Sequence, residues 1–111
     1  MDGFLFKPGE IVATQAVVAL AKRVPTLNVA NLVYRHCRGD FGIFGHYNEI
    51  RLSREEMKGT DVPTDVSGKL NKLGILHGGR IHSEYNVEGH RIWVITEIDR
   101  SSTTVLLPEE Y

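Results

Sequence analysis

The sequence predicts an α+β fold, in which short N-terminal helices pack on a C-terminal antiparallel β-meander. Helical spacing of apolar residues is confined to the part of the chain before residue 80, and β-rich runs fill the part after it. This order is typical of α+β domains rather than of α/β domains, in which helices and strands alternate. With 111 residues, the chain is expected to form a single domain, 1–111.

Two helices are expected first. Thr14 can serve as the N-cap of a helix that Pro25 ends. Thr26 or Asn28 would cap a second helix, and Gly39 stands where a left-handed residue commonly ends a helix. Apolar residues at helical spacing give each helix one buried stripe: Val17, Leu20, Ala21 and Val24 in the first, and Val29, Leu32, Val33 and Cys37 in the second.

The segments around these helices are less regular. Ile11–Ala13 is either a short strand or a lead-in to the first helix. The glycine-rich, aromatic stretch after Asp40 is expected to end in a short strand at Glu49–Leu52, and Ser53 begins a Ser-x-x-Glu capping box. Lys58–Gly68 is expected to be a mobile loop. A third helix would follow, with Asp65 or Ser67 as its cap and with Leu70, Leu73 and Leu76 as its apolar stripe.

Three β-rich runs make up the expected meander: Arg80–Asn86, Ile92–Ile98 and Thr103–Leu107. Val87–His90 and Asp99–Ser102 supply the two turns between them. The middle run carries apolar residues on both faces, so we expect it to lie inside the sheet rather than at an edge.

Composition narrows the classes of function. The chain has 13 Lys and Arg against 14 Asp and Glu, which argues against a protein that binds nucleic acid by net charge alone. Its single cysteine cannot form an internal disulfide, so we expect a reducing, cytoplasmic environment. No run approaches the ~20 apolar residues that a membrane span needs, so no membrane contact is expected. The spacing of His77, His82 and His90 matches no ligand pattern, so neither a metal nor another cofactor is expected.

Two polar clusters are candidates for binding. One lies at the end of the second helix, where cations, a histidine and a carboxylate could hold a phosphate or place a general acid and base. The same groups could instead satisfy the last helix carbonyls and the following turn. The other is the tip of the last hairpin, where polar side chains could meet a partner or stabilise their own turn. We expect the two clusters to form one shared polar surface from Arg35, His36, Arg38, Asp40, Asp99, Arg100 and Ser101.

Several stretches share the pattern of a known family. They are Val12–Thr14, the Arg-His-x-x-Gly-Asp-aromatic-Gly box at Arg35–Gly42, Asn71, the His-Gly-x-Arg-Ile segment at His77–Ile81, and the closing stretch Trp93–Tyr111. The closing stretch reads Trp-x-Ile-Thr-Glu-x-Asp-Arg-Ser-x-Thr-Thr-x-Leu-Leu-Pro-Glu-x-Tyr. Through them the chain resembles a family of short bacterial proteins encoded on plasmids, phages and other mobile elements. Residues 43–68 lie outside the resemblance, and Phe41 stands where the family more often has Trp. The resemblance implies a genomic setting and no reaction.

The leading hypothesis is an accessory protein of a mobile element that acts by protein-protein contact. It would inhibit or modulate a host nucleic-acid-acting or defence system, with a partner in the host or on the same element. Small size, balanced charge and the absence of a specific catalytic motif favour this hypothesis over an enzyme. An exposed sheet edge would also make a homodimer easy to build.

Two alternatives from other classes stay open. The first is a small ribonuclease or toxin of barnase- or RelE-like architecture, in which a histidine is the acid or base and arginine binds the phosphate. Its candidate residues are His36, Arg80, His82, Arg100 and Thr103. The second is a nucleic-acid-binding module that uses Arg35, Arg38, Arg80 and Arg100 as one patch.

Overall fold

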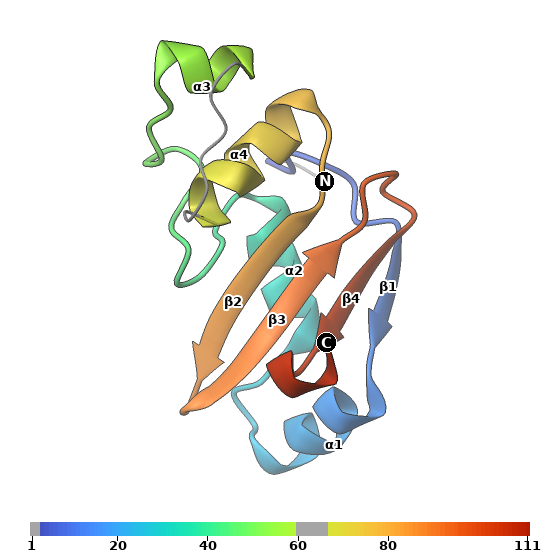
Figure 1. Ribbon diagram of the computed structural model, residues 1–111. Coiled ribbons are helices and arrows are strands. Elements are labelled where there is room, and N and C mark those ends of the chain that lie inside the picture. Colours follow the sequence, from blue (N-terminus) through green and yellow to red (C-terminus); the bar gives the residue numbers. More distant parts are fainter. Residues whose placement is uncertain (1–2, 60–66) are drawn as a thin grey trace.

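The computed structural model describes residues 3–59 and 67–111. Most of the expected loop Lys58–Gly68 therefore lies outside the described residues. The elements in chain order are β1 (Glu10–Ala13), α1 (Gln15–Arg23), α2 (Val29–Cys37), α3 (Arg54–Lys58), α4 (Ser67–His77), β2 (Ile81–Val87), β3 (His90–Thr96), β4 (Ser102–Leu106) and the short 3₁₀ helix η1 (Pro108–Glu110). The strands lie in the order β1-β4-β3-β2, and α2 crosses one face of the sheet (Figure 1). The α+β class and the antiparallel β2-β3-β4 meander are confirmed, with β3 inside the sheet.

Ile11–Ala13 belongs to a strand rather than to a lead-in of the first helix. β1 pairs in parallel with β4, so that Val12 lies level with Thr104. At its two ends, the Glu10 N–H donates to the Ser101 carbonyl at 3.0 Å and the Thr14 N–H donates to the Val105 carbonyl at 3.0 Å. The sheet is therefore mixed, with one parallel pair added to the expected meander.

The caps expected from the sequence at Thr14, Asn28 and Ser53 begin α1, α2 and α3. Thr14 accepts the Val17 N–H at 3.3 Å, and Asn28 rather than Thr26 caps α2 by accepting the Asn31 N–H at 3.0 Å. The Thr26 hydroxyl donates instead to the Glu88 carboxylate. Ser53 and its helix form both bonds of the capping box. Local side-chain chemistry thus sets where these helices begin.

The hydrophobic core lies between α1, α2 and one face of the sheet. The expected stripe of α2 is buried there, with Leu32 and Val33 each 3% exposed and Cys37 fully buried. Burial raises the pKa of the Cys37 thiol to about 12, so the thiol stays protonated as an inert core residue. The sheet contributes the inward residues Tyr85, Ile92, Val94 and Val105. None of the helices in the described parts of the chain is long and apolar enough to cross a membrane.

The prediction of a short strand at Glu49–Leu52 is wrong. The chain there forms a turn, in which the Glu49 N–H donates to the His46 carbonyl, followed by an irregular stretch. Lys72 of α4 donates to the carbonyls of Tyr47 and Ile50, each at 2.9 Å. Because a lysine satisfies these carbonyls, the segment needs no neighbouring strand to pair them.

The expected apolar stripe of α4 is also wrong. Leu70 and Leu76 are each 42% exposed, and the buried positions of this helix are Gly68, Asn71 and Gly74. Asn71 faces β2, where its amide Nδ2 donates to the His82 carbonyl at 2.6 Å and its Oδ1 accepts the His82 N–H at 2.9 Å. A Cβ at position 74 would lie 2.9 Å from the end of the Ile81 side chain and 3.1 Å from the Arg80 carbonyl, so glycine favours this close approach. Asn71 and Gly74 therefore mark the side of α4 that meets the sheet, whereas Gly68 lies against the Phe44 carbonyl.

Replacing Asn71 with Ala should destabilise the fold by about 2–3 kcal/mol, because both backbone groups of His82 would lose their partner in a buried position. The free energy of unfolding in urea measures this loss. Asn31→Ala is the control, since Asn31 is exposed and its bond to the Asn28 cap uses its backbone. If the free energy of unfolding of Asn71→Ala changed by less than about 0.5 kcal/mol, the usual range for surface substitutions and the range expected of Asn31→Ala, the assigned role of Asn71 would be contradicted.

Candidate functional site

His36 lies at the centre of a buried polar contact between α2 and the sheet. Its side chain is fully buried, and both ring nitrogens have hydroxyl partners. Nδ1 lies 2.6 Å from the hydroxyl of Ser83 on β2, and Nε2 lies 2.9 Å from the hydroxyl of Thr96 on β3. A single imidazole therefore joins the last turn of α2 to two neighbouring strands.

The contact continues through β4 to the segment before β1. The hydroxyls of Thr96 and Thr103 lie 2.6 Å apart, and the Thr103 hydroxyl donates to the Pro8 carbonyl at 2.7 Å. Since the only proton of Thr103 is used on Pro8, Thr96 must donate to Thr103 and accept from His36 Nε2–H. Nδ1 is then the acceptor, and Ser83 donates to it. We call Ser83, His36, Thr96, Thr103 and the Pro8 carbonyl the His36 network.

The four side chains of the His36 network are neutral and fully buried. Burial, together with the charges of the nearby His82 and Arg100, lowers the pKa of His36 to about 3. The ring of Phe6 packs edge-on against the imidazole, with 5.2 Å between ring centres. An RNA phosphate in solvent cannot reach this histidine or the equally buried Thr103, so the geometry gives no support to their proposed ribonuclease roles.

The other residues of the Arg35–Asp40 box point in different directions. Arg35 Nε donates to the Asp40 carboxylate at 2.7 Å, and its guanidinium lies over the ring of Tyr85. Arg38 donates to the Tyr34 hydroxyl at 2.7 Å. Partial burial would raise the pKa of Asp40, but the hydrogen bonds from Arg35 and the Gly42 N–H, together with the charges of Arg35 and His46, lower it. The box therefore supplies a buried histidine and two separate surface contacts.

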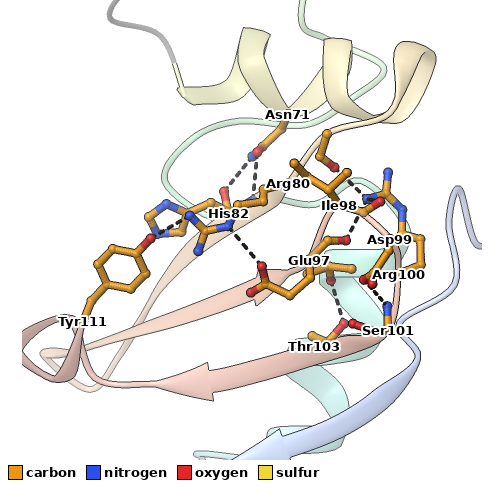
Figure 2. Close-up of polar contacts among 12 residues, drawn as sticks. Asn71, Arg80, His82, Glu97, Ile98, Asp99, Arg100, Ser101, Thr103 and Tyr111 are labelled. Carbon is orange, nitrogen blue, oxygen red and sulfur yellow. Dashed lines mark hydrogen bonds and ion pairs between the residues drawn. The ribbon is translucent and has the colours of Figure 1, made fainter.

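The hairpin tip is turned toward α4. Arg100 has a φ of 60°, and its guanidinium donates to the carbonyls of Gly79 at 2.6 Å and Gly74 at 3.1 Å (Figure 2). It also bonds to two carbonyls of its own turn. Asp99 accepts the Ser101 N–H at 2.9 Å. Hydrogen bonding by the side chain and the backbone of Ser101 lowers the pKa of Asp99. Arg100 is thus a fixed contact between the tip and the end of α4. The buried His36 cannot belong to a polar surface shared by the tip and the box, and such a surface formed by the remaining residues stays a prediction.

His82 and Arg80 lie on the opposite face of the sheet from His36. The His82 ring lies between Phe44 and Trp93, with ring centres 5.3 Å and 4.4 Å away, and its buried Nε2 has no partner among the described residues. Arg80 donates to the Tyr111 hydroxyl at 2.6 Å, and its Nε lies 3.6 Å from the Glu97 carboxylate (Figure 2). The four arginines proposed as a nucleic-acid patch each have intramolecular partners, so nucleic-acid binding stays a prediction.

The β2 edge of the sheet is covered by other parts of the chain. The Glu84 N–H donates to the Phe41 carbonyl at 3.2 Å, and the Glu84 carbonyl accepts the Ile43 N–H at 2.9 Å. Asn71 satisfies both backbone groups of His82 on the same edge. The segment 41–43 and Asn71 of α4 therefore cover this edge at Glu84 and His82.

The β1 edge is open. Since the N–H groups of Glu10 and Thr14 point to β4, the alternation of a strand directs the backbone groups of Ile11 and Ala13 outward. Within residues 3–59 and 67–111, no group bonds to them. The side chains here are apolar, with Ile11 51% and Val12 41% exposed. β1 is therefore a short strand with an apolar middle and an unpaired backbone edge.

Two members of the His36 network were missed as site residues. Ser83 and Thr96 occupy inward positions of β2 and β3, between apolar residues such as Tyr85 and Val94. A polar residue on the inward stripe of each of three neighbouring strands was a readable signal, because a buried hydroxyl needs a partner. The partner is His36, which lies on the buried stripe of α2.

Neither a metal centre nor a known relative identifies the site. In the described ranges, no three His, Cys, Asp or Glu side chains are grouped so that they could hold a metal ion. Comparison of the chain with protein-family models, curated proteins and solved structures gave no match. The two features that stand out are thus the buried His36 network and the open β1 edge.

The stability of the protein should fall as the pH falls from 6.5 toward 3. An unfolded His36 takes up a proton near pH 6.5, whereas the folded one resists protonation until about pH 3. Between pH 7 and pH 4 this difference should remove about 3 kcal/mol from the free energy of unfolding. Urea unfolding of His36→Gln should lack this part of the pH dependence, and His90→Gln, at an exposed position, should keep it. Equal slopes for wild type and His36→Gln would contradict the assignment.

Arg100→Lys should loosen the end of α4, because an ammonium group cannot reproduce the fork that reaches the Gly74 and Gly79 carbonyls together. We expect a loss of about 1–3 kcal/mol in the free energy of unfolding, with faster amide hydrogen exchange in the last turn of α4. Arg23→Lys, at an exposed position of α1, should change neither quantity. Unchanged exchange in Arg100→Lys would show that its guanidinium does not hold this end of the helix.

Proposed function

We propose that this protein is an accessory protein of a mobile element that acts in the cytoplasm by protein-protein contact, and that it binds an extended segment of its partner along β1. The partner belongs to the host or to the same element, and the contact inhibits or modulates a nucleic-acid-acting or defence system. The genomic setting in this proposal rests on the family resemblance of the box and the closing stretch. The choice of β1 as the contact surface rests on a difference between the two sheet edges: other parts of the chain cover the β2 edge, whereas the β1 edge is open.

That inequality is the observation that carries the proposal. A free strand edge favours pairing with other chains, and monomeric proteins usually cover it, shorten it or place charges or a proline on it. Here Asn71 and the segment 41–43 cover β2, whereas the middle of β1, formed by Ile11 and Val12, is apolar and exposed. An added strand would gain main-chain hydrogen bonds from Ile11 and Ala13 and would cover both side chains.

The polar side chains favour a binding role over catalysis. Arg100 is occupied by helix and turn carbonyls, and His36 is enclosed in its network. A general acid or base must come within hydrogen-bond reach of its substrate, which His36 cannot do in this conformation. Contact through the backbone of β1 needs no such group.

The proposal predicts a crosslink at position 11. A photoreactive benzoylphenylalanine in place of Ile11 should give one discrete adduct with a partner protein in host cells, because this side chain lies at the open edge. The matched control carries the same residue at Asn86, an exposed position on the β2 side of the sheet. The adduct should fall at least fivefold when Ala13→Pro is added, since proline removes an outward N–H without touching the bonds to β4.

No adduct at position 11, or the same adducts from positions 11 and 86, would overturn the assignment of β1 as the contact surface. Circular dichroism of each variant separates this outcome from loss of the fold.

A further inference from the structure

We infer that the segment bound by β1 is basic: it carries two Lys or Arg residues four positions apart, with a β-branched residue midway between them. This inference rests on the proposed function and names the chemistry of its partner. It comes from the charges at the two ends of β1 and from the side chain between them.

A carboxylate lies at each end of β1. Glu10 is exposed at the start of the strand. At the other end, the Thr14 hydroxyl donates to the Glu110 carboxylate at 2.9 Å, and the Leu107 N–H holds the same oxygen at 2.8 Å. Positions 10 and 14 are about 13 Å apart in an extended chain. A partner strand therefore meets negative charge at two points separated by four residues.

No cation of the described chain neutralises these two carboxylates. The ion pairs among the described residues are Arg35–Asp40, Lys69–Glu56, Arg80–Glu97 and Arg91–Glu84, and none includes Glu10 or Glu110. Opposite charges across neighbouring strands stabilise their pairing, whereas like charges oppose it. The free carboxylates thus favour a basic segment and disfavour an acidic one.

The alternation of the strand sets the rest of the pattern. Glu10, Val12 and Thr14 share one face, so the partner residues opposite them also share one face. Val12 is 41% exposed and lies between the two acidic ends. A β-branched residue packs well against such a neighbour. The expected motif is Lys-x-Val-x-Lys, which reads the same in both directions and so fits either strand orientation.

A second copy of this chain fits the edge poorly. A closed two-fold dimer must pair its β1 strands in antiparallel fashion. With the axis at Val12, the register that pairs both outward residues within the strand, Ile11 of each copy would face Ala13 of the other. Glu10 of each copy would then lie opposite Thr14 of the other copy and beside the carboxylate that this threonine holds. Both ends of the interface would bring like charges together, which costs stability.

The test measures binding of fluorescein-labelled peptides by anisotropy. The basic probe contains Lys-Thr-Val-Thr-Lys between Gly-Ser flanks, and the matched acidic probe contains Glu-Thr-Val-Thr-Glu. We expect the full-length protein to bind the basic probe at least about tenfold more tightly, as two exposed charge pairs are gained and two repulsions avoided. Glu10→Lys should weaken binding of the basic probe, and Ala13→Pro should abolish it.

The outcomes separate this inference from the proposed function. If both probes bind equally and Ala13→Pro abolishes the binding of both, the inference that the bound segment is basic is overturned and contact through β1 stands. A crosslink at position 11 without binding of the basic probe also overturns the inference that the segment is basic, and leaves contact through β1 standing. Self-association in sedimentation that Ala13→Pro abolishes would make a second copy the occupant and overturn the inference. Absence of probe binding, crosslink and self-association would overturn both proposals.

Discussion

The fold depends on one constraint, the burial of a neutral imidazole between α2 and the sheet. A fully enclosed His36 must have partners for both ring nitrogens, because an unsatisfied buried polar atom costs about 1–3 kcal/mol. Ser83 and Thr96 meet this requirement, and the proton of Thr103 fixes the direction of every bond in the network. These hydrogen bonds fix the position and orientation of α2 on β2, β3 and β4 more specifically than apolar packing alone would.

The same network connects the core to the open edge. Its last bond ends on the carbonyl of Pro8, two residues before β1 begins. From there the chain enters the parallel pairing with β4, which leaves the backbone groups of Ile11 and Ala13 facing outward. Figure 1 shows the consequence, with β1 at one side of the sheet and β2 at the other, beside α4. The core therefore holds β1 at the open edge of the sheet.

Features set by neighbouring residues were predictable from the sequence, and features set by distant contacts were not. The cap at Thr14, the capping box at Ser53 and the meander follow from local chemistry and alternation. The parallel pairing of β1 joins residues about ninety positions apart and leaves no local pattern. The buried face of α4 was assigned to leucines because periodicity does not register an amide such as Asn71 that pairs with a strand edge. His36 was named as a candidate, but its burial depended on hydroxyls from three strands.

The central claim is that His36 is a buried, neutral, Nε2-protonated imidazole. Long-range ¹H–¹⁵N correlation of the histidine rings between pH 8 and pH 4 tests it directly. We expect His36 to show the Nε2–H tautomer throughout this range and not to titrate while the protein stays folded, because its pKa is lowered to about 3. Titration near pH 6.5, or a proton on Nδ1, would contradict the direction of the network and the account built on it.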